Sequence, residues 1–323
     1  MEILLHPKAK HLDGGNNFDR MMIDIEKSIR LQDDWLKTVE KRSVRGNKLH
    51  NYIKLRLLAL EIRLNLHQPL VLIGIKKRWF NEFQDYWTNC LGGHPLFVMD
   101  YHDLKFHYRT KSRFKSANEL SWETPKKHLD NWQTPENIAV LFHFVLKYAL
   151  RPVWEARLPE LLKPGMKVLE YGCGLAPIYR TYRSFFNHIE TEWYLADIPT
   201  FPFHFIRYNY GRDKEANFIC ITEDKMDDPL KDIKEDFDFI IIQEVFEHLD
   251  KPEFIAEYLL NRLKPGGLFY FDYINSEGKG LDTPAGKNER ISTLKFLAEK
   301  LDIISGDLYT DERNVATCIG VKK

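Results

Sequence analysis

The chain has 323 residues, of which 44% are hydrophobic, so it is long enough to form about two domains with real cores. Its 47 basic and 47 acidic side chains balance to a net charge of zero, which argues against a global basic field for nucleic acid, although a local patch is still allowed. No run of 18 apolar residues occurs, so the sequence predicts no membrane-spanning helix.

The cysteines and the N-terminal residues indicate a cytoplasmic protein. Cys90, Cys173, Cys220 and Cys318 lie far apart and form no C-x-x-C pair, so we expect reduced thiols, with neither a disulfide framework nor a metal site. The chain begins M-E-I-L-L-H-P-K, which lacks the long apolar core and the small-residue cleavage site of a signal peptide.

The first 130 residues are predicted to form a separate, mainly helical domain. Apolar side chains at helical spacing predict amphipathic helices over about 18–41 and 47–66. A further helix, over 76–90, stands between two short apolar stretches that are typical of strands, 70–75 and 95–101. The stretch from 70 to 101 fits either a small β-α-β unit or a helical lid interrupted by apolar loops.

Positive side chains occupy every second position from Lys105 to Lys115. In an extended strand this alternation places all of them on one face. One interpretation is a solvated edge strand that its lysines protect from aggregation. The other is a cradle for phosphate or another acidic group, such as RNA or a nucleotide-linked substrate.

Two stretches that contain tryptophan and proline follow, S-W-E-T-P at 121–125 and N-W-Q-T-P at 131–135. Loops of this composition can fold over a pocket. Packing of Trp122 and Trp132 in a core explains them equally well, so the sequence leaves both interpretations open.

From residue 135 onward, helices and short apolar strands are predicted to alternate. Helices are expected over 135–150 and 153–162, after the glycine turn described below to about residue 186, and over 252–263 and 291–300. The stretches typical of strands are 166–170, 192–196, 217–221, 237–242, 268–273 and 315–322, with a turn at 264–267 and the last strand at an edge. This alternation predicts a doubly wound α/β sheet.

The stretch V-L-E-Y-G-C-G-L-A-P at 168–177 predicts a ligand site. It reads as a strand, a glycine turn and the start of a helix, and Gly172 and Gly174 carry no Cβ, so a ligand can approach the backbone closely. The third glycine of the dinucleotide fingerprint is missing, because Pro177 stands in its place. No histidine lies near Cys173 in the sequence, so we interpret this cysteine as a small turn residue.

Asp197 ends the next predicted strand, about 20 residues after the glycine turn. A carboxylate at this position can accept hydrogen bonds from both hydroxyl groups of a ribose. A surface aspartate is the alternative, and the place at the tip of a strand favours the functional interpretation.

Together these motifs resemble the class I S-adenosylmethionine-dependent methyltransferases. The glycine motif is matched by 168–174, the ribose acid by Asp197, the fourth-strand motif by 237–249, and the stretch before the fifth strand by 263–267. The resemblance covers roughly residues 135–323. It implies a Rossmann-like methyltransferase fold with a mostly parallel seven-stranded sheet at 131–323, and leaves 1–130 as a substrate-capping domain.

The resemblance implies S-adenosylmethionine as the cofactor and a set of residues around it. Asp197 would bind the ribose, and Pro199, which departs from the family pattern, would bend the loop over the adenosine. The other implied contacts are Glu170, Tyr171, Gly172, Cys173 and Gly174 at the methionine end, Ile198, Thr222 and Glu223 around the adenine, and Gln243 through its backbone.

A catalytic base is expected after the strand 237–242. If the acceptor is a hydroxyl group, a side chain must take its proton, and His248 is the first candidate because its pKa is easily tuned. Glu244 and Glu247 lie in the same stretch. A structural role for His248, which would cap or orient its helix, fits the sequence equally well.

The expected function is methyl transfer to an oxygen or nitrogen of a small polar metabolite or sugar, by in-line displacement at the sulfonium methyl. One alternative is an enzyme of the same fold that consumes the cofactor without methylation, such as a cyclase that releases methylthioadenosine. A second is an RNA-modifying methyltransferase that uses the basic stretch 105–115, and a third is a regulatory protein that binds the cofactor without catalysis. We expect a small-molecule substrate, and neither nucleic acid nor a membrane as partner; the sequence does not identify the acceptor or the oligomeric state.

Overall fold

The computed structural model describes residues 2–4, 22–24, 77–91, 95, 120–133, 138–147, 153–275 and 281–323. Backbone contacts divide the chain into two compact units, one of Met1–Phe114 with Thr134–Arg151 and the other of Lys115–Gln133 with Pro152–Lys323. The predicted helix at 47–66, the two predicted strands of the N-terminal half except Pro95, and the basic stretch 105–115 lie outside the described residues.

In the first unit, short strands pair near the N-terminus. β1 (Glu2–Leu4) runs antiparallel to β2 (Met22–Asp24), with Ile3 opposite Ile23. The predicted helix over 18–41 is therefore wrong at Met22–Asp24, where strand pairing overrides the helical spacing of the apolar residues.

The helix predicted over 76–90 is confirmed in the first unit. It consists of α5 (Lys77–Asp85) and a π-helical turn, η1 (Tyr86–Cys90), and α8 (Ile138–Lys147) lies within the predicted helix 135–150. Phe83 is buried and packs 5.1 Å from Phe142 of α8, between ring centroids. None of the helices in the described ranges combines the length and apolar character needed to cross a bilayer.

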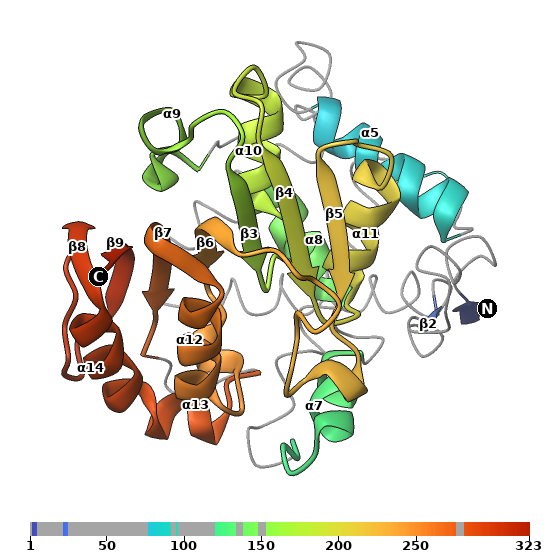
Figure 1. Ribbon diagram of the computed structural model, residues 1–323. Coiled ribbons are helices and arrows are strands. Elements are labelled where there is room, and N and C mark those ends of the chain that lie inside the picture. Colours follow the sequence, from blue (N-terminus) through green and yellow to red (C-terminus); the bar gives the residue numbers. More distant parts are fainter. Residues whose placement is uncertain are drawn as a thin grey trace, which may run out of the picture. The chain divides into compact units, whose positions relative to one another are not determined.

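The second unit is built on a seven-stranded sheet with the order β5-β4-β3-β6-β7-β9-β8 (Figure 1). Its strands are β3 (Lys167–Tyr171), β4 (Glu192–Asp197), β5 (Ala216–Cys220), β6 (Phe237–Ile242), β7 (Leu263–Tyr273), β8 (Leu301–Ser305) and β9 (Val315–Lys322). The pairs from β5 to β7 are parallel, and β9 is antiparallel to both of its neighbours. The predicted doubly wound, mostly parallel sheet is confirmed.

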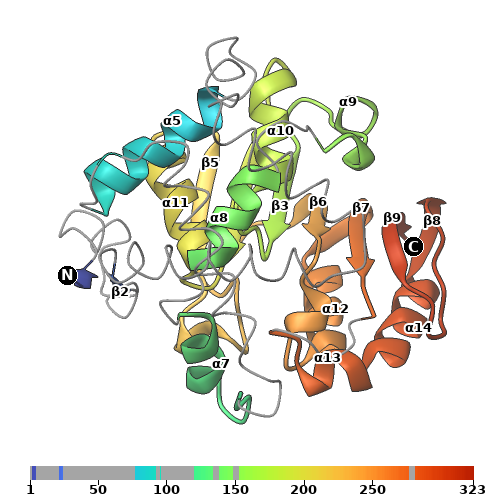
Figure 2. The same ribbon diagram turned by 180° about the vertical axis from the view of Figure 1, so that it is seen from behind.

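Helices cover both faces of this sheet, which explains why its central strands are almost continuously apolar. On one face, α10 (Pro177–Phe185) packs Tyr182 against Trp193, and α11 (Phe201–Tyr210) packs against β5. On the other face, α12 (Pro252–Asn261) and α14 (Arg290–Lys300) join the core that contains Leu169 and Ile240 (Figures 1 and 2).

Three local predictions are wrong. The strand 315–322 is not at the edge, because β8 follows α14 without a break and pairs on its outer side. The turn expected at 264–267 lies inside β7, where the register with β6 shifts. The helix predicted over 153–162 is interrupted by Arg157 at φ 48°, which leaves the 3-10 turn η4 (Trp154–Ala156) and α9 (Leu158–Leu161).

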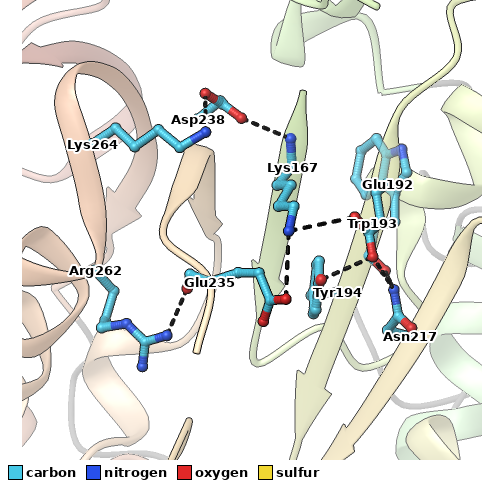
Figure 3. A network of polar contacts seen from close by, with 9 residues as sticks. All are labelled: Lys167, Glu192, Trp193, Tyr194, Asn217, Glu235, Asp238, Arg262 and Lys264. Carbon is cyan, nitrogen blue, oxygen red and sulfur yellow. Dashed lines mark hydrogen bonds and ion pairs between the residues drawn. The ribbon is translucent and has the colours of Figure 1, made fainter. Parts of the chain in front are cut away.

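A polar network joins the amino ends of five parallel strands (Figure 3). Asp238 accepts from the backbone N–H of Lys167 at 2.8 Å and from Nζ of Lys264 at 2.7 Å. The ammonium of Lys167 lies 3.8 Å from Glu192 and 3.5 Å from Glu235. These charges are paired with one another at the amino edge, and the glycine turn lies at the opposite, carboxyl edge.

Candidate functional site

The glycine turn follows β3 directly and combines a packed side with an open side. Gly172 has φ 64° and Gly174 has φ 50°, in the left-handed region that favours glycine. A Cβ on Gly172 would lie 2.4 Å from Cγ2 of Val245, whereas a Cβ on Gly174 would meet no atom within 4 Å. The backbone at Gly174 is therefore the part of the turn that a ligand can approach.

These two glycines should respond differently to alanine. We expect Gly172→Ala to lower the free energy of unfolding by about 2–4 kcal/mol, because it adds a left-handed residue and a steric clash. We expect Gly174→Ala to cost only about 1–2 kcal/mol, from the left-handed backbone alone, while its methyl group hinders the cofactor. Urea unfolding and calorimetric titration measure the two effects, and cofactor binding by Gly174→Ala at the wild-type affinity would contradict this assignment.

Glu170, in the strand before the glycine turn, binds the start of the helix that follows the turn. Its carboxylate is buried and accepts from the backbone N–H of Tyr179 at 2.9 Å and of Ile178 at 3.3 Å, so it holds the first turn of α10. Burial raises the pKa of Glu170 to about 8. Burial also raises the pKa of the Cys173 thiol well above its ordinary value, so Cys173 stays protonated within the turn.

Asp197 ends β4 beside the glycine turn. Its Oδ2 accepts from the backbone N–H of Gly174 at 2.6 Å, and its Oδ1 accepts from the N–H of Ile198 at 2.7 Å. Its carbonyl accepts from the N–H of Ile221 at 2.8 Å, which ties the end of β5 to the same place. A carboxylate has about four acceptor positions, so capacity for two ribose hydroxyls is left.

The raised pKa of Asp197 predicts that both the stability of the fold and the affinity for the cofactor depend on pH. Its pKa is raised to about 7, because burial disfavours the charged form and the hydrogen bonds from Gly174 and Ile198 offset only part of that effect. The folded chain therefore keeps a proton on Asp197 at a pH where the unfolded chain has already lost it. The contribution of Asp197 to the free energy of unfolding is complete at acid pH and is lost as the pH rises towards 7.

Ribose hydroxyls favour the ionised carboxylate, so cofactor affinity should rise with pH up to about 7 and then level off. Calorimetric titration between about pH 6 and pH 8 checks this expectation, and the dependence should be absent from Asp197→Asn. An affinity that stays constant in the wild-type enzyme would contradict it.

The other predicted cofactor residues lie at the carboxyl ends of neighbouring parallel strands, where ligands bind in such sheets. Tyr171 is buried at the end of β3, and Ile198 packs against the core. Thr222 donates from Oγ1 to Asp224 at 2.6 Å. Glu223 is exposed and opens the 3-10 turn η5 (Glu223–Lys225), and Gln243 is half-buried after β6. An acceptor-only carboxylate beside an open glycine backbone fits the ribose and methionine parts of S-adenosylmethionine.

Glu244 and Glu247 follow β6, where the chain changes direction. Glu244 has φ 53°, and its backbone N–H donates to Oδ1 of Asp272 at 2.6 Å. Glu247 is only 7% exposed, and its Oε2 has no hydrogen-bond partner among the described residues. Burial raises the pKa of Glu247, although the charge of His248 acts in the opposite direction.

His248 ends the 3-10 turn η6 (Phe246–His248), and its ring is fixed through one nitrogen. Nδ1 lies 3.1 Å from Oδ1 of Asp282 and 3.2 Å from the carbonyl oxygen of Leu281. Because both partners are acceptors, we assign the proton to Nδ1, which leaves Nε2 as the basic nitrogen. Burial alone would lower the pKa of His248, but the hydrogen bond to Asp282 and the charges of Glu247 and Asp282 outweigh it, and the pKa is raised.

The helix α7 (Pro125–Trp132) belongs to the same unit as this site. Its last residue, Trp132, lies with its ring centroid 5.2 Å from that of His248. Gln133 donates from Nε2 to the carbonyl of Pro199 at 3.1 Å, so the end of α7 is joined to the loop after Asp197. The sequence did not decide whether Trp132 lies over a pocket or in a core, and it gave no sign of Asp282, because no local pattern places either residue beside His248.

Comparison with known proteins gives one match by sequence family. The model of a methyltransferase domain matches residues 141–305, just over half of the 323 residues. No curated protein matches the sequence.

Several solved structures are similar to part of this chain at low sequence identity. The N-methyltransferase NodS from Bradyrhizobium japonicum WM9 is 13% identical with a TM-score of 0.39, and the alignment covers 52% of this chain and 93% of that chain. A methyltransferase from Pyrococcus furiosus is 16% identical with a TM-score of 0.37, over 54% and 84% of the two chains. The [4+2]-cyclase SpnF is 14% identical with a TM-score of 0.38, over 52% and 79%. The sheet and the family match together establish that the chain belongs to the class I S-adenosylmethionine-dependent methyltransferases.

Proposed function

We propose that the enzyme methylates an oxygen or nitrogen of a small polar metabolite or sugar, with His248 as the general base. The observation that carries this proposal is the pair of acceptors, Asp282 and the Leu281 carbonyl, on Nδ1 of His248. They hold the ring in the tautomer whose Nε2 can take a proton from the acceptor.

The cofactor, when bound, supplies an electrophilic sulfonium methyl group. In our proposal, Asp197 accepts hydrogen bonds from the ribose hydroxyls, and the open backbone at Gly174 receives the methionine part. The turn that holds the methionine part is formed by Glu170, Tyr171, Gly172 and Cys173. Ile198, Thr222 and Glu223 border the adenine, and Gln243 contacts the methionine part through its backbone.

The remaining side chains position the acceptor. His248 removes the proton as the methyl group is transferred, and the buried Glu247 and Asp282 stabilise the charge that His248 then carries. Glu244, in the same stretch, is the second candidate for the base. Residues 1–130 are proposed to cap the substrate. The charge-balanced composition supports a small acceptor over RNA.

The proposal is tested by identifying the products that form from S-adenosylmethionine. The full chain is incubated with methyl-deuterated S-adenosylmethionine and mixtures of sugars, polyols and amines, and the products are identified by mass spectrometry. We expect S-adenosylhomocysteine together with an equal amount of deuteromethylated acceptor. Methylthioadenosine without S-adenosylhomocysteine would instead indicate a cyclase, and methylation of RNA alone would overturn the small-molecule acceptor.

A further inference from the structure

Several buried polar atoms on α7, just before it and next to His248 have no hydrogen-bond partner among the described residues. They include Nε1 of Trp122, Nδ1 of His128, Nε1 of Trp132 and Oε2 of Glu247. His128 is 3% exposed, so bulk solvent does not reach its ring. Such groups are rare in native proteins, because each one costs about 1–3 kcal/mol when it is left unsatisfied.

These atoms belong to side chains that surround one place. His128 and Trp132 are four residues apart on α7, so they share one face of the helix. The Trp132 ring contacts the His248 ring edge-on, and His128 lies close enough to His248 and Asp250 for their charges to act on its pKa. The Trp122 ring lies 5.0 Å from the His128 ring, between centroids. The inner face of α7 is thus turned towards the proposed base.

The position of α7 links this face to the cofactor side of the site. Thr124 caps the helix by accepting from the N–H of Lys127 at 3.2 Å, and Gln133 holds its other end to Pro199. Pro199 lies two residues after Asp197. Trp132 therefore covers one side of the His248 ring, at the end of α7 that Gln133 joins to the loop after Asp197.

We propose that His128 and Trp132 form the wall of the acceptor site beside His248, and that they select a neutral, hydroxyl-bearing acceptor of the sugar or polyol class by hydrogen bonds to its hydroxyl groups. This inference rests on the proposed function and specifies its substrate. Aromatic rings with a few polar atoms among them are usual in sites for small molecules, and Trp122, His128 and Trp132 supply both.

The chemistry of the side chains supports this class of acceptor. The indole N–H of Trp132 can only donate, and it matches a hydroxyl oxygen. Burial lowers the pKa of His128 to about 4, so its imidazole is neutral near pH 7 and pairs with a hydroxyl group without a salt bridge. The carboxylates of Asp250 and Asp282, near His128 and His248 respectively, would repel an anionic acceptor.

Trp132→Phe tests the role of the indole N–H, because it keeps an aromatic ring beside His248 and removes the donor together with the five-membered ring of the indole. Trp193→Phe is the matched control, because it makes the same change in a tryptophan whose Nε1 already donates to Thr191 at 2.9 Å and whose ring packs against Tyr182 of α10. KM and kcat are measured at saturating cofactor with monosaccharides, cyclic polyols, their deoxy analogues, primary amines and carboxylates. Melting temperatures are recorded for each variant.

We expect the wild-type enzyme to methylate hydroxylated compounds, and Trp132→Phe to raise their KM roughly tenfold with kcat changed by less than about threefold. Its melting temperature should fall less than that of Trp193→Phe, because both variants lose the same part of the indole but only the N–H of Trp193 has a hydrogen-bond partner. The KM of Trp193→Phe should be unchanged. His128→Phe should raise KM in the same way, and it serves if Trp132→Phe does not fold.

Two results would overturn the inference while leaving methyl transfer intact. One is product formation with unchanged KM in both α7 variants, and the other is methylation of amines or carboxylates only. Absence of any S-adenosylhomocysteine with the wild-type enzyme would instead remove the proposed function itself, so the two failures are distinguishable.

Discussion

Asp197→Ala is expected to weaken S-adenosylmethionine binding about a hundredfold. The carboxylate lies beside the open glycine backbone and has acceptor capacity for two ribose hydroxyls. A hydrogen bond to a charged group contributes about 1.5–3 kcal/mol, so the loss of two such bonds costs at least about 3 kcal/mol. Because 1.4 kcal/mol corresponds to a factor of ten, this loss is roughly hundredfold in Kd, measured by calorimetric titration.

The control for this prediction lies at the opposite edge of the same sheet. Asp238→Ala also removes an aspartate that accepts from a backbone N–H, but it does so at the amino ends of the strands. We expect it to lower the free energy of unfolding by about 1–2 kcal/mol and to leave the cofactor Kd unchanged. Equal Kd values for Asp197→Ala and the wild-type enzyme would remove the ribose assignment.

The elements that carry the cofactor site could be predicted because each is encoded locally. Gly172 and Gly174 stand directly after an apolar strand, and Asp197 ends the next strand, so the topology of a parallel sheet brings them to one edge. The hydrogen bond between Gly174 and Asp197 confirms that these two elements are neighbours. Their roles in binding the cofactor remain proposals.

The surroundings of His248 could not be predicted in this way. Asp282 reaches it from a later part of the chain, and Trp132 reaches it from an earlier helix, and neither distance follows from spacing along the sequence. The strand β8 was missed for a related reason, because Leu301 continues α14 into the strand without a glycine or proline to mark the boundary.

A histidine base should be visible as a loss of turnover without a loss of cofactor binding. We expect His248→Ala to lower kcat by about 10²–10⁴-fold, the usual contribution of general base catalysis, with the cofactor Kd changed by less than about twofold. His188→Ala is the matched control, because His188 is exposed after α10, outside the site. Full activity of His248→Ala would exclude this residue as the base.

The Asp282–His248 pair adds a second, independent signature, in the pH dependence of kcat. Asp282 raises the pKa of His248, and the base must be neutral to act, so the acidic limb of the wild-type profile should reflect that raised value. In Asp282→Asn the pKa falls towards its ordinary value, so the limb should move to lower pH, while kcat on the plateau decreases because the ring is less well oriented. A purely structural role for Asp282 would lower the melting temperature and leave the limb in place. The direction of the shift therefore distinguishes a positioned base from a histidine that only supports its turn.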